Sequence, residues 1–377
     1  MAAPAYLLGS GLVTCLGEGL PAQVAALSQR KPGAARKPEG LNIPPWPYHL
    51  AGDTARPDWI YEMLAAAVTP ALAQAGLGAD AQRRMAIFVG STCIDLPLHE
   101  SRYAQSLQHG EGAVVMLAPS FGNLAAHLAR QFGIEGPQYT LNTACSSSAN
   151  ALLHAHWMLR EGDIDHALVV GAEAYNRLSV QGFGSLMLLS RQGYRPFDRA
   201  RDGLVLGEGA GVMVLGRDAP AGVERPLQLL GGASACDPSS PTNSSPERIA
   251  DVMNAALEDA GTPLAALCAI KAHGTGTPSN DASEGLGMRK LGGALPPFTS
   301  LKPYTGHTLG GCGTIETLGL LAAWQQGFLP GTPGFEAADP EIGLAPIVQS
   351  QPMPARGAVL CNFFGFGGNN TSLVVAR

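Results

Sequence analysis

One cysteine and two histidines of this sequence stand in segments of small residues, and each segment comes directly after an apolar run. Cys145 lies in Asn-Thr-Ala-Cys-Ser-Ser-Ser (142–148), which predicts a turn from a strand into a helix. Helix N-termini carry unpaired N–H groups that stabilise negative charge, so we expect a lowered thiol pKa and a reactive thiolate here. The same groups can hold the oxyanion of an attacked thioester. A small buried core cysteine is an equally good interpretation of Cys145 alone.

Each histidine also ends an apolar run, in a turn that only glycine and small residues can make. His273 belongs to Ala-His-Gly-Thr-Gly-Thr-Pro (272–278), and His307 belongs to Gly-His-Thr-Leu-Gly-Gly (306–311). Charged residues accompany both turns: Asp281 and Glu284 after the first, Lys302 before the second and Glu316 after it. A single histidine is more often structural than catalytic, but two in the same context favour a catalytic pair.

The C-terminal segment Asn-Phe-Phe-Gly-Phe-Gly-Gly-Asn-Asn-Thr (362–371) is a glycine-rich turn between two strand-like runs. A phosphate-binding loop is disfavoured because no Lys-Ser/Thr pair follows and no helix begins here. Flexible glycines around Phe366 predict a gate that can move. A tight hairpin turn without a gating role is the alternative interpretation.

The elements that must position these turns follow an α/β pattern, because short apolar runs bounded by glycine alternate with helical patterns. The predicted strands cover 6–9, 85–89, 139–142, 167–171, 211–215, 227–230, 269–272, 359–362 and 372–376. The predicted helices cover 59–75, 122–132, 247–260 and 314–326, with a kink or break at Pro70. The polar segment 217–226 is the best boundary candidate, so we predict two similar α/β halves, residues 1–220 and 221–377.

Composition and charge exclude several classes of partner. Charged residues make up only 14% of the chain, which predicts that a partner subunit covers part of the surface in a dimer. The net charge of -6 and the lack of a Lys/Arg-rich run argue against nucleic acid as a partner. Seven scattered cysteines without zinc-binding spacing predict reduced thiols in the cytoplasm. No apolar run of about 18 residues is present, and the N-terminus resembles a first strand more than a signal peptide, so no membrane span is expected.

Together with Arg-Pro-Phe-Asp-Arg-Ala-Arg-Asp-Gly (195–203) and Gly-Glu-Gly-Ala-Gly (207–211), these segments resemble the elongating β-ketoacyl-acyl carrier protein synthases of type II fatty acid synthesis and the ketosynthase domains of polyketide synthases. The resemblance runs in the same order from about residue 85 to the C-terminus, which makes it far more specific than any single motif. It implies a thiolase-type fold: two duplicated βαβαβαββ halves in a five-layered α-β-α-β-α sandwich. It also implies decarboxylating condensation of an acyl thioester on Cys145 with malonyl-acyl carrier protein, which extends an acyl, polyketide or polyene chain by two carbons.

The resemblance assigns roles to the reactive residues. Cys145 matches the acylated nucleophile, and His273 and His307 match the two catalytic histidines. The histidines must stay uncharged near neutral pH to donate hydrogen bonds to the enolate that loss of CO2 leaves. Lys302 matches a lysine that acts on the site electrostatically, and Glu316 resembles its acidic partner.

Further positions surround this set. Phe366 matches the gatekeeper phenylalanine, whose backbone N–H joins that of Cys145 in the oxyanion hole. Asp281 and Glu284 match positions that order water and loops. The positions that contact the substrate and its phosphopantetheine arm are Thr275, Thr277, Phe364, Gly365 and Gly367. No metal or redox cofactor is implied, because the substrates travel on the phosphopantetheine of an acyl carrier protein. The implied assembly is a homodimer, or a heterodimer with a second synthase-like chain.

Several positions depart from the family pattern. Asn150 stands where fatty acid enzymes often carry a histidine, which brings the Cys145 segment closer to polyketide ketosynthases. Cys15 and Cys312 replace the commoner proline and alanine, and Phe363 is an unusual second phenylalanine. The region before Cys145 is shortened, so the starter group and the chain length are left open.

A non-catalytic partner subunit, similar to the chain-length factors that pair with ketosynthases, is the alternative function from another class. Such subunits usually lack the nucleophilic cysteine, whereas this chain has the whole set. A degradative thiolase fits less well, because that class resembles a Cys/His/Cys set rather than the Cys/His/His set found here.

Overall fold

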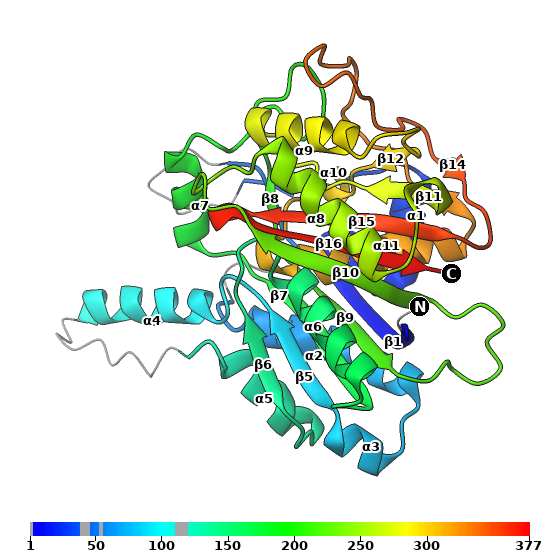
Figure 1. Cartoon of the computed structure of the whole chain (residues 1–377). Coiled ribbons are helices and arrows are strands. Elements are labelled where there is room, and N and C mark those ends of the chain that lie inside the picture. Colours follow the sequence, from blue (N-terminus) through cyan, green and yellow to red (C-terminus); the bar gives the residue numbers. More distant parts are fainter. Residues whose placement is uncertain (1–2, 38–45, 53–55, 110–119) are drawn as a thin grey trace.

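The computed structural model describes residues 3–37, 46–52, 56–109 and 120–377. One large mixed sheet runs through the molecule (Figure 1). Its strands are β1 (Ala5–Thr14), β2 (Gly17–Glu18), β5 (Ala86–Gly90), β6 (Gln138–Leu141), β7 (His166–Glu173), β9 (Gly209–Gly216), β10 (Gln228–Cys236), β11 (Leu267–Lys271), β12 (Phe298–Thr299), β15 (Ala358–Gly365) and β16 (Asn369–Ala376). Their order is β12-β11-β15-β16-β10-β1-β9-β7-β5-β6, with β2 beside β1. Small separate sheets contain β3 (Ala35–Arg36), β4 (Tyr48–His49) and β8 (Leu206–Gly207), and β13 (Phe328–Leu329) with β14 (Gln351–Pro352).

The main sheet consists of two halves with the same pattern of strand directions. In one half, β6, β5 and β7 are parallel, and β9 and then β1 follow antiparallel. In the other half, β12, β11 and β15 are parallel, and β16 and then β10 follow antiparallel. The halves meet where β1 and β10 pair through Ala5 with Leu229 and Tyr6 with Gln228. The duplicated pattern is that of the thiolase-type fold expected from the sequence.

Helices form three layers around and between the two half-sheets. They are α1 (Gly19–Ser28), α2 (Trp59–Ala75), α3 (Ala79–Arg84), α4 (Leu96–His109), α5 (Asn123–Phe132), α6 (Ser147–Glu161), α7 (Arg177–Ser185), α8 (Pro246–Asp259), α9 (Pro278–Lys290), α10 (Lys302–Thr305) and α11 (Cys312–Gln325). Helices α2 and α5 cover the outer face of one half-sheet, and α8, with α9 beside it, covers the other. Between the halves lie α6 and α11, which contact strands of both. The result is a five-layered α-β-α-β-α sandwich.

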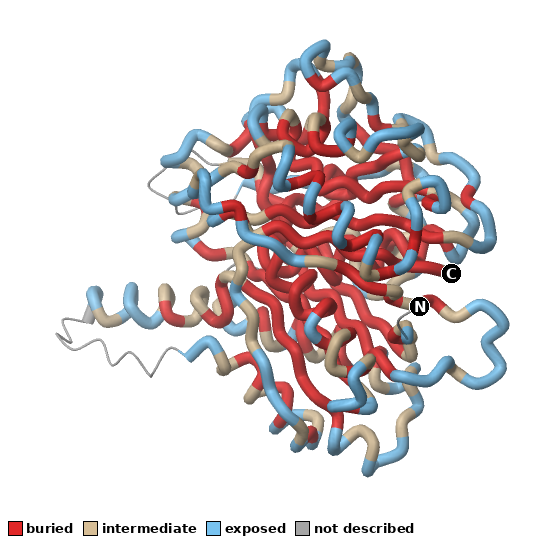
Figure 2. Tube along the Cα trace, in the orientation of Figure 1, coloured by how far each residue is buried: buried red, intermediate tan, exposed pale blue. Residues whose placement is uncertain are grey.

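The apolar pattern of each element matches its layer. The strand residues of β9 are all buried and those of β7 nearly so, as expected for strands covered on both faces. Helix α11 is buried from Cys312 to Trp324, which fits the central layer, whereas α8 has an exposed polar face. Buried segments gather in the strands and the central helices, while the protruding α4 is largely exposed (Figure 2).

The nine predicted strands and four predicted helices are all present, with ends that differ by a few residues. The expected kink or break at Pro70 does not interrupt α2, which continues to Ala75. Close packing holds this helix: a Cβ on Gly9 or Gly11 of β1 would lie 2.0 or 1.8 Å from carbonyl oxygens of α2. Segment 217–226 connects β9 to β10, and the division into residues 1–220 and 221–377 stays a prediction. Within the described residues, no helix is both long and apolar enough to span a membrane.

Candidate active site

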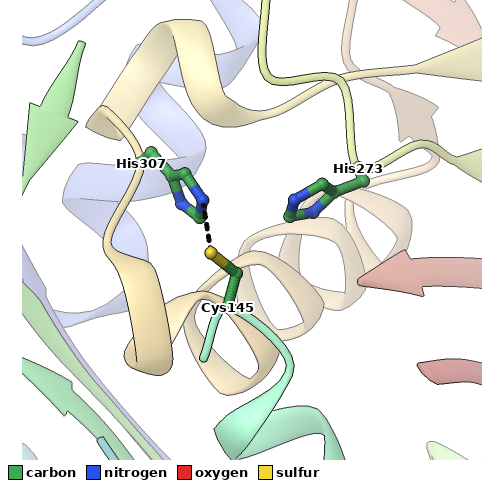
Figure 3. Close-up of side chains that lie close together, drawn as sticks. All are labelled: Cys145, His273 and His307. Carbon is green, nitrogen blue, oxygen red and sulfur yellow. Dashed lines mark hydrogen bonds between the residues drawn. The ribbon is translucent and has the colours of Figure 1, made fainter. Parts of the chain in front are cut away.

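Cys145, His273 and His307 meet in one buried cluster although they lie far apart in the sequence (Figure 3). The Sγ atom of Cys145 lies 3.1 Å from Nε2 of His307. The two imidazole rings are 5.3 Å apart between centroids and nearly perpendicular, at 82°. The exposed fraction is 5% for the cysteine and 1% for each histidine. The structure therefore brings together the three residues that the sequence singled out.

The turn between β6 and α6 carries Cys145, two residues before the helix begins. Ala144 has a φ of 54°, in the left-handed region, so the chain bends sharply directly before the thiol. Ser147 holds the turn, because its Oγ accepts the N–H of Thr143 at 3.0 Å and donates to the carbonyl of Ala144 at 2.6 Å. A Cβ on Gly90 would lie 2.3 Å from the α6 backbone, so only glycine lets β5 approach the start of this helix.

Two backbone N–H groups face the thiol, those of Cys145 and Phe366. Phe366 begins the turn η3 (Phe366–Gly368) between β15 and β16. The two segments approach closely, since a Cβ on Gly365 would lie 2.9 Å from the carbonyl oxygen of Thr143 and 3.0 Å from the nitrogen of Cys145. This pair of N–H groups can hold an oxyanion that forms at a thioester carbonyl attacked by Sγ.

The protonation state of Cys145 differs from the one expected. Burial raises the pKa of its thiol to about 12, and the Lys302 ammonium and the two backbone N–H groups lower it only in part. The lowered pKa predicted from the helix N-terminus is therefore wrong for the resting site, because the loss of solvation of a buried thiolate outweighs these groups. The thiol proton must leave Sγ during the reaction, and Nε2 of His307 is near enough to accept it.

Brief treatment with iodoacetamide at neutral pH should therefore modify the exposed Cys236 before Cys145. The thiolate is the reactive form, and the raised pKa keeps Cys145 in the thiol form. Its alkylation rate should keep rising from neutral pH to about pH 10. Peptide mapping by mass spectrometry gives both rates. A plateau near neutral pH would reveal a preformed thiolate–imidazolium pair instead.

Both histidines are uncharged at neutral pH, as the expected chemistry requires. Burial first, and then the Lys302 ammonium, hold the pKa values of His273 and His307 well below the usual 6.5. Lys302 Nζ lies 3.2 Å from Nδ1 of His273, and an ammonium only donates, so the ring proton of His273 is on Nε2. Nδ1 of His307 has no hydrogen-bond partner among the described residues. No hydrogen bond thus fixes the tautomer of His307, whose Nε2 can accept or donate.

Asp281 and Glu284, both buried on α9, fix the turn that carries His273. Glu284 accepts the backbone N–H groups of His273 and of the next residue, at 2.7 and 2.8 Å. Asp281 accepts those of Phe197 at 2.7 Å and Gly276 at 3.1 Å. Burial raises the pKa of both carboxyls against these hydrogen bonds, that of Glu284 to about 7. Their contacts agree with the loop-ordering role expected for them.

A buried lysine that sequence reasoning missed completes the charged cluster. Glu316 receives two ammonium groups: Lys302 Nζ lies 2.6 Å from Oε1, and Lys271 Nζ lies 2.6 Å from Oε2. Lys271 also donates to the carbonyl of Asn362 at 2.8 Å. The available signal was a charged residue inside the apolar run that precedes His273, since lysines are almost never fully buried without a partner.

The cluster opens into a pocket. Of the positions assigned to substrate contact and gating, those on its wall are Thr275, Thr277, Phe364, Gly365 and Phe366. Gly367 is not part of the lining, and its N–H donates to the carbonyl of Pro241 at 2.8 Å, so the substrate contact expected of it is not supported. Lining residues that the sequence did not indicate are Phe183, Leu186, Leu188, Leu204, Thr242, Asn243, Ser244, Ser279 and Asn280. Ser279 and Asn280 directly follow the His273 segment, whereas the other seven come from distant parts of the chain and are brought to the pocket by folding alone.

Phe366 lines the pocket from the tip of the hairpin between β15 and β16, a position that both interpretations of the glycine-rich segment share. Its ring stacks on Phe183 at 5.5 Å between centroids. The far side of the turn is anchored, because the N–H of Asp237 donates to the carbonyl of Gly368 at 2.9 Å. Movement of the Phe366 ring remains a prediction.

Gly368→Ala should disturb the gate strongly. Gly368 has a φ of +70°, and a Cβ there would lie 1.9 Å from the carbonyl oxygen of Asp237, so the turn must shift. Condensation should fall by about tenfold or more, because small displacements of positioning groups are costly. Gly292→Ala is a matched control, with a φ of +74° and nothing within 4 Å of the added Cβ. Equal turnover in the two variants would show that the turn does not need this geometry.

The same three side chains are the group among the described residues that could hold a metal ion, with ligand atoms within 4.8 Å of one another. The surrounding charge disfavours a cation there. The Lys302 ammonium lies 3.2 Å from His273, and the group contains no carboxylate to offset a second positive charge. This donor set fits hydrogen bonding to an oxyanion better than metal binding.

Comparison with known proteins gives the same family for both parts of the chain. The sequence matches the family models described as "Beta-ketoacyl synthase, N-terminal domain" over residues 52–221 and "Beta-ketoacyl synthase, C-terminal domain" over residues 228–336. The 3-oxoacyl-[acyl-carrier-protein] synthase 2 of Vibrio cholerae is 31% identical and aligns with 88% of this chain and 85% of its own length. A mitochondrial 3-oxoacyl-[acyl-carrier-protein] synthase of Arabidopsis thaliana is 33% identical over 67% of this chain and 59% of its own.

Similar solved structures extend over the whole chain. A structure described as "The ishigamide ketosynthase/chain length factor" has a TM-score of 0.88 and 27% identity, and it covers 100% of both chains. The ketosynthase ApeO in complex with its chain length factor ApeC, from Xenorhabdus doucetiae, has a TM-score of 0.84 and 29% identity over 99% of this chain and 98% of that one.

Proposed function

The chain belongs to the β-ketoacyl synthase family, and we propose that it uses Cys145 to condense an acyl thioester with malonyl-acyl carrier protein. The product is an acyl or polyketide chain, a polyene among the candidates, that is longer by two carbons. One observation carries the proposal: a thiol and two uncharged imidazoles share one pocket, with Sγ 3.1 Å from an imidazole nitrogen.

Acyl transfer comes first. Sγ of Cys145 attacks the thioester carbonyl, and its proton passes to Nε2 of His307. The carbonyl oxygen becomes an oxyanion held by the N–H groups of Cys145 and Phe366. Collapse expels the phosphopantetheine thiolate, which takes the proton back from His307. One difficult condensation is thereby divided into two easier steps.

Decarboxylation and carbon–carbon bond formation follow. Malonyl thioester loses CO2, and the electrons of the broken bond form an enolate. His273 and His307, each with its proton on Nε2, donate hydrogen bonds to the enolate oxygen. Such hydrogen bonds stabilise the negative charge strongly because the site is desolvated. The enolate carbon attacks the acyl carbonyl on Cys145. The thiolate leaves and takes up a proton from solvent, because loss of CO2 from the malonyl carboxylate releases none, and the β-ketoacyl product stays on the carrier.

The pocket wall suits the phosphopantetheine arm that would deliver both substrates. Thr275 and Thr277 share a hydrogen bond of 2.9 Å between their hydroxyl groups, and both line the pocket. Asn243 and Ser244 add polar groups to the lining. Hydroxyl and amide side chains can pair with the two amides of the arm, which supports an acyl carrier protein as the partner.

We also propose a dimer, either of two copies or with a second synthase-like chain, in the cytoplasm. Two of the similar structures pair a ketosynthase with a chain length factor, which supports the second arrangement. Strand β6 is an edge strand, paired only with β5 among the described residues, and Tyr139 on it is 39% exposed. An edge of this kind can add a strand from another subunit. The seven cysteines are unpaired, which fits a reducing compartment.

The test uses purified protein, alone and co-expressed with a synthase-like partner, incubated with a medium-chain acyl-carrier protein and malonyl-carrier protein. Mass spectrometry should detect an acyl adduct on Cys145 and a β-ketoacyl product two carbons longer, and light scattering gives the subunit number. Absence of both the adduct and the product in every combination would favour the non-catalytic partner role instead.

A further inference from the structure

Lys271 is a buried charge for which the condensation mechanism has no use. It ends strand β11, two residues before His273, and its side chain is fully buried. Its ammonium lies 2.6 Å from Oε2 of Glu316 and 3.6 Å from the ring centroid of Phe363. A buried ammonium is costly unless its partners offset the lost hydration, so its place beside the reacting residues needs a reason.

The charge balance of the cluster supplies that reason. Lys302 and Glu316 alone would form a neutral pair, since the ammonium lies 2.6 Å from the carboxylate. With Lys271 on the second carboxylate oxygen, two positive charges share one negative charge, and the cluster carries a net charge of +1. This excess charge lies beside His273, which Lys302 contacts directly.

We propose that Lys271 is a positioning residue which acts through Glu316 to leave the Lys302 ammonium uncompensated beside His273. This inference rests on the proposed function. The excess positive charge keeps both imidazoles in the uncharged form that can donate to the enolate, and it attracts the negative charge that develops as CO2 leaves. Lys271 thus tunes the site without touching substrate.

The other groups around the cluster act in the directions this inference requires. Burial first, then Lys302 and Lys271, lower the pKa of His307. For His273 the causes are burial, Lys302, His307 and Lys271, in decreasing order. The titratable groups facing the three charges are Cys145 from the β6–α6 turn, Tyr194, His273, His307, Cys312 from α11 and Cys361 from β15. Burial raises the pKa of each of these thiols and of Tyr194, so they stay protonated at neutral pH. Burial also raises the pKa of Glu284, which holds the His273 turn, to about 7, so a histidine-specific signal is needed to separate its titration from that of the imidazoles.

Two variants separate charge from structural support. Lys271→Gln removes one positive charge and changes the cluster from +1 to 0, while its amide can still donate to the carbonyl of Asn362. Lys271→Gln/Glu316→Gln removes one charge of each sign and returns the cluster to +1. If charge is the cause, the double variant should resemble the parent. If Lys271 merely holds Glu316 in place, the double variant should be at least as impaired as the single one.

The measurement is an NMR titration of the protein labelled with 13C-histidine, together with the rate of malonyl-coenzyme A decarboxylation against pH. In Lys271→Gln the protonation midpoints of His273 and His307, and the acid limb of the rate profile, should move up by about one pH unit. The double variant should return both toward the parent. Unchanged midpoints in the single variant, or no recovery in the double variant, would overturn the inference.

Folding and function are controlled in the same experiment. Removal of one partner of a buried ion pair is often destabilising, although Glu316 keeps the Lys302 ammonium as its partner. Thermal melting therefore checks that Lys271→Gln is folded, and Lys271→Met replaces it if the glutamine variant unfolds. The NMR midpoints do not depend on turnover. A parent protein without decarboxylation would therefore count against the proposed function, whereas unmoved histidine midpoints would count against Lys271 alone.

Discussion

Cys145→Gln should abolish condensation, by more than about 10⁴-fold, while malonyl decarboxylation persists or rises. No acyl-enzyme can form without Sγ, so the second substrate has nothing to attack. His273 and His307 remain, however, and they are the groups that stabilise the enolate. The uncharged glutamine side chain can occupy the space of an acylated cysteine and favour the state that accepts malonyl thioester.

Single-turnover acylation, condensation and CO2 release are measured separately on the same protein. Cys312→Ala is the matched control, because Cys312 is also fully buried nearby and its thiol donates to the carbonyl of Cys145 at 3.0 Å. That variant should keep an acyl adduct on Cys145. Condensation by the Cys145→Gln protein at a rate near that of the parent would remove the nucleophile from the mechanism.

His273→Ala and His307→Ala should each slow malonyl decarboxylation by about 10²- to 10³-fold, which corresponds to about 2.7 to 4 kcal/mol, the usual effect of removing one oxyanion donor. Their effects on acylation should differ. Nε2 of His307 lies 3.1 Å from Sγ, so His307→Ala should also slow acyl transfer. The His273 ring is hydrogen-bonded to Lys302 and not to Sγ, so His273→Ala should slow acyl transfer much less than it slows decarboxylation.

His156→Ala serves as the control for loss of a buried histidine, since its ring is fully buried on α6 with neither nitrogen hydrogen-bonded among the described residues. His156→Ala should change the stability of the protein and leave the ratio of the acyl-transfer rate to the decarboxylation rate unaltered. A histidine variant that decarboxylates at the parental rate would contradict enolate stabilisation. Equal losses of acylation in both active-site variants would contradict the separate role of His307.

The candidate site was predictable where its chemistry depends on local sequence. Cys145, His273 and His307 each stand in a turn whose small residues are required by close packing, and that requirement is visible as a motif. The pocket wall around Phe183 was not predictable, because it comes from distant segments. Lys271 was visible as a charged residue in an apolar run, but its partners Glu316 and Asn362 were not. The predicted lowering of the Cys145 thiol pKa was wrong for a related reason. The helix N-terminus that lowers the pKa is visible in the local sequence, whereas the burial that raises it depends on the whole fold.

Fold prediction followed the same division. Strands covered on both faces are continuous apolar runs, so β7 and β9 were found within a few residues. Short strands such as β12, and helices such as α7 and α9, were not among the predicted elements, and α9 has almost no apolar period. Pro70 does not break α2, and packing of this helix against the glycines of β1 can offset the missing hydrogen bond, while the kink stays a prediction. The five-layered arrangement of two duplicated halves came from the family resemblance and not from the apolar pattern.

The η3 turn that carries Phe366 is very short, and its two ends continue into β15 and β16 inside the main sheet. Rearrangement of such a turn involves rotation about a few backbone bonds and no domain closure, which places it among loop motions of about nanoseconds to microseconds. Turnover by enzymes commonly takes milliseconds or longer. The gate would then reopen many times within one catalytic cycle, and the order of substrate entry would be governed by how acylation redistributes its positions, not by waiting for it to open.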